Sequence, residues 1–224
     1  MFDITWIDLI CLTAVKGHDI ESVRRAIGVE SPFRRADQVR LDRNPPPELV
    51  TISSWSEGIL ICQRGSGTRC AKPETLAALA AGGRSVMTAC WHDRGISPMW
   101  PGWENLLALA ADGQLLSALD PSDVPGRRFG HDTAALDPYL AGARFDYETV
   151  PVRRMADQEI GYGAEGSVTV AHWRYACITA LERFMHADLE ESMVSPDNPD
   201  HQFILSTSLP IPPIPLSEFM HMPG

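Results

Sequence analysis

The hydrophobic and polar positions of this chain alternate in short runs that predict strands and helices in turn. Six apolar runs predict strands at residues 8–16, 50–55, 59–64, 84–91, 106–110 and 115–119. Asp19 can cap a helix over residues 20–27, whose apolar side chains fall on one face. Pro73 at a first helical position opens a second helix, which a pair of glycines ends at 82–83. Strands and helices therefore follow one another through short connections.

The second half of the chain contains fewer strands and one long amphipathic run. The Asp-Gly pair at 112–113 is a strong hairpin-turn signal between two apolar runs. Beyond it, Asp132 can cap a broken helix that Pro138 restarts. Residues 168–187 predict a long helix, and 203–209 a last strand. The residues expected on one face of that long helix are Val170, Trp173, Cys177, Leu181 and Phe184.

This order of elements predicts an α+β protein. We expect an antiparallel or mixed sheet with helices mainly on one face, plus a C-terminal helix and a proline-rich tail. Residues 1–147 are expected to form the sheet core, and residues 148–209 to add a helix and a strand that pack on it. Residues 210–224 would then be a proline-rich arm.

Composition excludes several classes of partner. The net charge is −10, only Lys16 and Lys72 are lysines, and no basic run exists, so nucleic acid is not an expected partner. The apolar N-terminal run lacks a positive start and is too short to span a bilayer, so no membrane is expected either. The five cysteines are widely spaced within apolar runs, which predicts buried, reduced thiols in the cytoplasm. No C-x-x-C pair occurs, and we expect no metal and no cofactor.

Three pieces of the chain resemble an uncharacterised actinobacterial family, catalogued as domain of unknown function 6461. They are residues 9–28, 57–91 and 108–146, and they include the turn ADGQLLSALDP and the RRFG element. No established activity comes with that family, so the resemblance implies no function. This chain departs from the family in a longer loop after Trp91 and in its proline-rich end. Additions to a scaffold are common places for function.

The loop that follows Trp91 is the first candidate site. His92, Arg94, Trp100 and Trp103 lie in this segment, WHDRGISPMWPGWE, whose glycines and prolines are typical of a loop. The tryptophans can cover an open sheet edge, anchor another protein, or form the walls of a pocket for a small anionic molecule. We interpret them as contact residues and not as catalytic ones.

Arginines and histidines elsewhere give weaker signals. Arg127 and Arg128 can bind an anion or pair with the acidic surface of the protein itself. His-Asp pairs occur at 18/19, 92/93 and 131/132, but adjacent side chains usually point apart, and two of these aspartates stand where a helix cap is wanted. Residues 161–166 (GYGAEG) match a dinucleotide fingerprint without the buried strand that should precede it. None of these is a catalytic signature, so catalytic residues stay unknown.

The proline-rich arm is the second candidate site. A polyproline segment makes no internal hydrogen bonds and loses little entropy on docking, which suits an arm that binds its own domain or a partner chain. The docking residues that we expect are Pro210, Ile211, Pro212, Pro213, Ile214, Pro215 and Phe219.

Together these features predict a protein that works by association. The leading hypothesis is an accessory or interaction subunit of a heteromeric complex, one that completes an enzyme of specialised metabolism and is not catalytic on its own. The first alternative is a binding protein or enzyme for a small anionic molecule, using the loop at 91–103. The second is a toxin-neutralising or regulatory protein.

Overall fold

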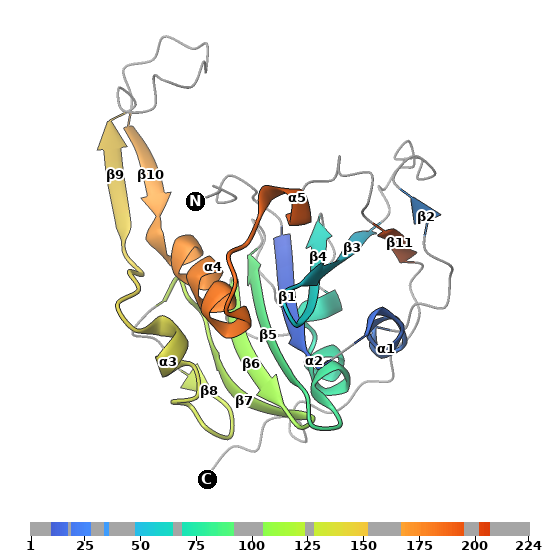
Figure 1. Cartoon of the computed structure of the whole chain (residues 1–224). Helices are drawn as coiled ribbons and strands as arrows, with labels where there is room; N and C mark the ends of the chain where they lie inside the picture. Colours follow the sequence, from blue (N-terminus) through green and yellow to red (C-terminus); the bar gives the residue numbers. More distant parts are fainter. Residues whose placement is uncertain are drawn as a thin grey trace.

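The central feature of the fold is a nine-stranded sheet with the order β2-β11-β3-β4-β1-β5-β6-β7-β8 (Figure 1). The computed structural model describes residues 10–17, 19–27, 34–35, 48–64, 69–91, 105–123, 128–151, 167–194 and 202–206. The strands are β1 (Ile10–Lys16), β2 (Arg34–Arg35), β3 (Glu48–Trp55), β4 (Gly58–Arg64), β5 (Ser85–Trp91), β6 (Asn105–Ala111), β7 (Gln114–Leu119), β8 (Arg128–Phe129) and β11 (Gln202–Ser206). Every pairing in this sheet is antiparallel. The α+β prediction is confirmed, and of its two alternatives the sheet is the antiparallel one.

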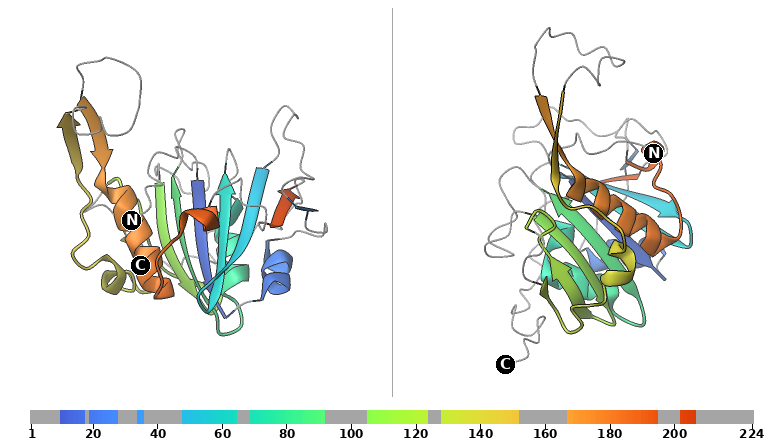
Figure 2. Two further views of the ribbon diagram at one scale, coloured as in Figure 1. Left: turned by 45° about the horizontal axis from the view of Figure 1, so that its top comes forward. Right: turned by 90° about the vertical axis from the view of Figure 1, so that its left-hand side faces the viewer.

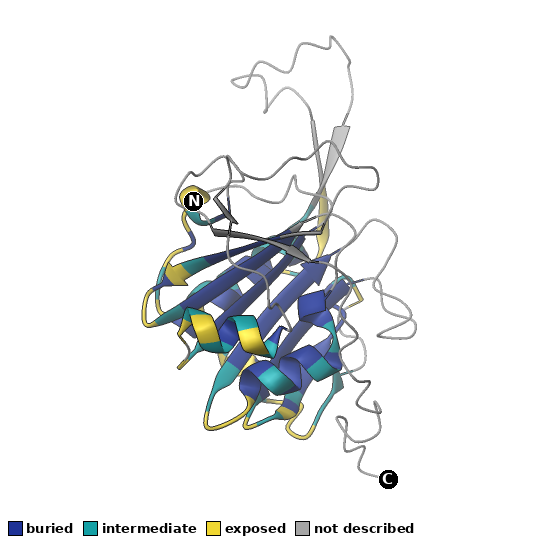
Figure 3. Ribbon diagram, turned by 90° about the vertical axis from the view of Figure 1, so that its right-hand side faces the viewer, coloured by how far each residue is buried: buried dark blue, intermediate teal, exposed yellow. Residues whose placement is uncertain are grey.

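Helices cover both faces of the sheet. The helix α1 (Ile20–Ala26), the 3₁₀ turn η2 (Arg69–Ala71) and α2 (Pro73–Ala80) pack on one face (Figure 3). On the other face lie α3 (Asp137–Leu140), α4 (His172–Met185) and α5 (Glu191–Val194) (Figure 2, right). The helices α1 and α2 thus share one face, while α3 and the C-terminal helix α4 take the opposite one.

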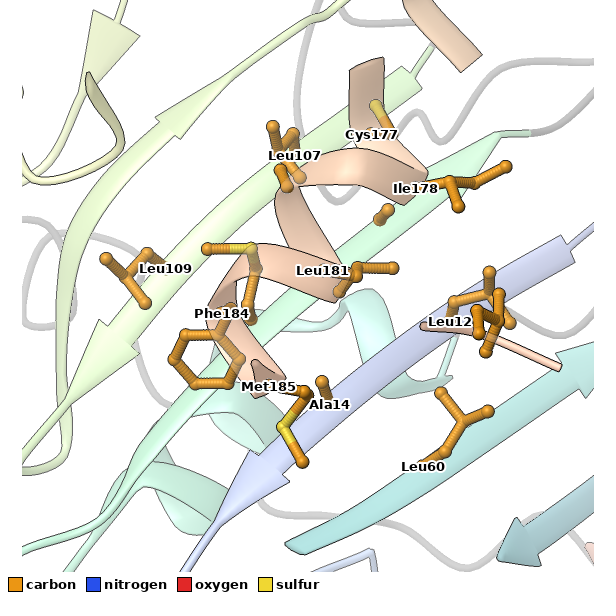
Figure 4. Packing of buried hydrophobic residues seen from close by; sticks show 14 of the residues in the cluster. Leu12, Ala14, Leu60, Leu107, Leu109, Cys177, Ile178, Leu181, Phe184 and Met185 are labelled. Atoms are coloured by element: carbon orange, nitrogen blue, oxygen red, sulfur yellow. The ribbon is translucent and has the colours of Figure 1, made fainter. Parts of the chain in front are cut away.

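The strand β1 contributes side chains to two separate hydrophobic cores. Cys11 and Val15 belong to the core under α1 and α2, whereas Leu12 and Ala14 belong to the core under α4 (Figure 4). Successive side chains of a strand point to opposite faces, so a strand that is covered on both sides needs apolar residues throughout. All four of these residues are fully buried.

A separate two-stranded ribbon extends beyond the sheet. It consists of β9 (Tyr147–Pro151) and β10 (Ser167–Ala171), which pair antiparallel and lie next to the start of α4 (Figures 1 and 2). The long helix was predicted to begin at residue 168, but it begins at His172, so Val170 lies in a strand. The sequence SVTVA is rich in β-branched residues, which fit a strand better than the first turn of a helix. Residues 173, 177, 181 and 184 share the buried face, as predicted.

Local signals were interpreted correctly at three positions. Asp19 caps α1, because its Oδ1 accepts a hydrogen bond from the Ser22 backbone N–H at 2.8 Å. Pro73 is the first residue of α2. Asp112 and Gly113 both have positive φ, 51° and 77°, as the tight turn between β6 and β7 requires. Asp132, by contrast, caps a turn, and α3 begins only at Asp137.

The five cysteines are all buried, as predicted, and none of them is in a disulfide bond. Among the described residues, no group of three or more metal-binding side chains is arranged to hold an ion. No helix in the described ranges has the length and apolar character needed to cross a membrane.

Candidate functional site

An aromatic cluster forms where β5 ends and where α4 begins. Trp91 is 1% exposed, and its ring meets the ring of Trp173 edge to face, with centroids 6.1 Å apart. The guanidinium of Arg174 lies 5.4 Å from the Trp173 ring centroid and 6.0 Å from that of Trp91. Trp91 was predicted as a contact residue, and the structure corrects this: its side chain belongs to the core and has almost no surface left for a partner.

Tyr147, the first residue of the ribbon, connects this buried cluster to the protein surface. The indole Nε1–H of the buried Trp173 donates a hydrogen bond to the Tyr147 hydroxyl at 3.1 Å. The Tyr147 residue is 55% exposed, and among the described residues it is the one large hydrophobic side chain that is exposed. The hydrogen bond restrains the hydroxyl end of the Tyr147 ring. The surface here therefore carries an aromatic group in a fixed position.

Charged residues that flank Tyr147 in the chain form a cluster of ion pairs. Arg144 binds Asp146 through two hydrogen bonds of 3.1 and 2.6 Å, and its other nitrogen lies 3.6 Å from Glu148. The Glu148 carboxylate in turn lies 2.9 Å from Nε2 of His172. Arg144 holds the pKa of the Asp146 carboxyl below its usual value, and Asp146 raises the pKa of Arg144. Because the arginine and both carboxylates are about half exposed, water screens these pairs and they add little stability.

Sequence analysis missed the His172–Glu148 pair, although the two residue types are common partners. They are separated by 24 positions, and the ribbon brings them together. The backbone N–H of His172 also donates to the carbonyl oxygen of Asp146 at 3.0 Å, which closes the base of the ribbon. A histidine beside a carboxylate can hold or move a proton. No local sequence motif predicts such a pair, because the two residues are 24 positions apart in the chain.

The predicted anion site at Arg128 is occupied by the protein's own groups. Its guanidinium forms an ion pair with Asp137 and donates to the carbonyl oxygen of Thr133. Arg128 therefore pairs with the acidic surface of the protein itself, which is the second of its two expected roles. Asp132 likewise accepts from the backbone N–H of Ala134, as a turn residue does.

Most other candidates lie outside the described residues. These are His92, Arg94, Trp100 and Trp103 of the tryptophan loop, Arg127, the GYGAEG segment at 161–166, and the whole arm at 210–224.

Comparison with known proteins adds no relative. No family model, no curated protein and no solved structure matches this chain. The resemblance to the uncharacterised actinobacterial family accordingly stays a prediction.

Proposed function

We propose that this protein is an accessory chain that works by associating with another protein through the surface around Tyr147. The observation that carries the proposal is an aromatic side chain that is more than half exposed and yet held by a hydrogen bond from a buried tryptophan. An anchor that is already restrained loses little conformational entropy on binding, and tyrosine is enriched among the residues that dominate protein interfaces.

The surroundings of Tyr147 support association. Arg144, Asp146 and Glu148 flank Tyr147 in the chain and form a cluster of exposed ion pairs at this end of the ribbon. An aromatic centre with a polar rim is the usual composition of interfaces between proteins that also exist apart. His92 follows Trp91 directly in the chain, so the loop that was the first candidate site in the sequence begins at a residue of this cluster.

The proposed partner is a different protein chain, in keeping with the hypothesis of a subunit that completes an enzyme of specialised metabolism. A toxin-neutralising protein would use the same kind of surface, and only the identity of the partner separates the two. The experiment is native mass spectrometry of the protein isolated gently from its producing cells. A stoichiometric complex with a second chain is expected.

Variants connect that complex to the proposed surface. Tyr147→Ala and Arg144→Ala should each weaken the association, whereas Arg25→Ala, an exposed arginine of α1 on the opposite face of the sheet, should leave it unchanged. Circular dichroism of each variant controls for folding. A complex that survives Tyr147→Ala would contradict the proposal, and so would a monomer that carries only a small-molecule mass.

A further inference from the structure

The core beneath η2 and α2 contains a row of polar side chains, in which two thiols face each other across neighbouring strands. Cys11 of β1 stands opposite Cys90 of β5 on one side and opposite Gln63 of β4 on the other. One step further along β1, Thr13 stands opposite Thr88, and their hydroxyl oxygens are 2.7 Å apart. All five residues are at most 1% exposed, so this cluster lies in the interior of the protein.

The surroundings of the two thiols shift their pKa values in opposite directions. A hydrogen bond with the Cys90 thiol, and further ones with the hydroxyls of Thr88 and Thr13, hold the pKa of Cys11 below that of an ordinary thiol in spite of its burial. The Thr88 and Thr13 oxygens lie 3.5 and 3.9 Å from the Cys11 sulfur. The hydrogen bond to Cys11 and burial raise the pKa of Cys90. Of the pair, Cys11 therefore loses its proton first, and Cys90 keeps its own.

We propose that Cys11 and Cys90 form an oxidation site, at which a peroxide converts the two thiols into a reversible cross-strand disulfide. The Cys11 thiolate attacks one peroxide oxygen, the O–O bond breaks, and Cys11 becomes a sulfenic acid. The other oxygen leaves as hydroxide and takes up the proton that the Cys11 thiol had released, which gives the first water. The Cys90 sulfur then attacks the Cys11 sulfur, the S–O bond breaks, and the hydroxide leaves as water with the Cys90 proton. Two thiols and one hydrogen peroxide thus give one disulfide and two waters.

The position of the pair in the sheet gives the oxidant a way in. Ile10 and Trp91 form the last residue pair of the β1–β5 ladder, and Cys11 and Cys90 are the next pair inward. The ends of strands open more readily than their centres, so separation of this end of the ladder is the route by which we expect a peroxide to reach the thiols.

The geometry of opposed strands makes the disulfide feasible and easy to reduce. The Cβ atoms of directly opposed residues lie about 4.5–5.5 Å apart in an antiparallel pair. A disulfide requires about 3.5–4.5 Å, so its formation draws the strands together slightly. A bond formed under such strain has a raised reduction potential, which is typical of labile and regulatory disulfides.

The remaining cysteines lack this arrangement. Cys62 stands opposite Leu12 and Thr51, on the face of the sheet covered by α4. Cys177 is on α4, and burial raises its pKa. Cys70 is on η2 above the row, where its backbone N–H donates to Gln63 at 3.1 Å. The Cys11 and Cys90 pair is thus the one in which two cysteines occupy directly opposed positions of the described sheet.

The test uses the full chain in its native, reduced state. Hydrogen peroxide is added, free thiols are then alkylated under denaturing conditions, and the peptides are analysed by mass spectrometry without reduction. We expect a linked peptide pair that contains Cys11 and Cys90, with the other three of the five cysteines alkylated, and full reversal by dithiothreitol. Alkylation of all five cysteines would overturn the proposal, and so would a linkage between any other two.

Two variants separate the proposed pair from general oxidation. In Cys90→Ala the reaction should stop at the sulfenic acid of Cys11, which dimedone traps, while Cys62→Ala should still give the Cys11–Cys90 linkage. Oxidised wild type should also unfold at a higher urea concentration than reduced wild type, because the bond closes a loop of roughly 80 residues in the unfolded chain. Unchanged dimedone labelling in Cys90→Ala relative to wild type would contradict the relay between the two sulfurs.

Discussion

Replacing Tyr147 by phenylalanine tests whether the exposed aromatic ring is tied to the core in the way that the structure indicates. The variant keeps the ring and removes only the hydroxyl, which accepts the Trp173 Nε1–H at 3.1 Å. Trp173 is 4% exposed, so its N–H then loses its protein acceptor in a largely apolar setting. The change therefore acts on one hydrogen bond and leaves the packing nearly intact.

The expected cost follows from how far water can replace the lost acceptor. Leaving a buried donor unsatisfied costs about 1–3 kcal/mol. Tyr147 is half exposed, and water can reach this side of the indole, so we expect a loss of about 1 kcal/mol in the free energy of unfolding. In a protein of this size, that corresponds to a decrease of roughly 2–4 °C in Tm.

The assay is urea unfolding followed by circular dichroism, with a matched control on another tyrosine. The Tyr139 ring packs edge to face on Phe184, with centroids 5.8 Å apart, and the described contacts include no hydrogen bond to its hydroxyl. Tyr139→Phe should therefore change the free energy of unfolding by less than about 0.5 kcal/mol. In a Trp173→Phe background, Tyr147→Phe should cost nothing, because the donor is already gone. Equal costs in both backgrounds would refute the reasoning.

Two further predictions concern backbone geometry and pH. Gly130 has a φ of 130°, and a Cβ there would lie 2.2 Å from the carbonyl oxygen of Leu116, so Gly130→Ala should cost about 3 kcal/mol or more. Gly83 has a φ of 76° with no heavy atom within 4 Å of its Cβ position, so Gly83→Ala should cost only about 1–2 kcal/mol; similar urea midpoints for the two variants would contradict the difference. Hydrogen bonds from the backbone and side chain of Ser22 lower the pKa of Asp19 from its ordinary 3.8, so its stabilising effect is complete above that value and disappears as pH falls through the lower, folded-state pKa. Asp19→Ala should lower Tm near neutral pH and differ less from wild type below about pH 3; a difference that does not vary with pH would count against this account.

Sequence analysis was most successful where the chemistry is local. The cap at Asp19, the proline start of α2 and the turn at 112–113 each depend on a few neighbouring residues, and each was predicted. The strands β1, β3, β4, β5, β6 and β7 were recognised from their apolar runs. Hydrophobic pattern and turn residues carry this information directly.

The candidate site was less predictable. Trp91 has the same apolar side chain whether it covers an edge, meets a partner or packs in a core, and only the tertiary structure, in which it packs against Trp173, decides that it is buried. The His172–Glu148 pair and the hydroxyl acceptor for Trp173 depend on how β9 pairs with β10. These residues are distant in sequence, so no spacing rule brings them together.

By itself the sequence determined the class of the protein, most of its elements and the burial of its cysteines, because each depends on residue type and local order. Only the tertiary structure decided that β11 lies between β2 and β3, that the two sides of β1 enter separate cores, and that Cys11 faces Cys90. The physical reason is the same in all three. An apolar run indicates that a strand is buried. The register of the strand with its neighbours decides which side chains meet, and the packing of the whole sheet sets that register.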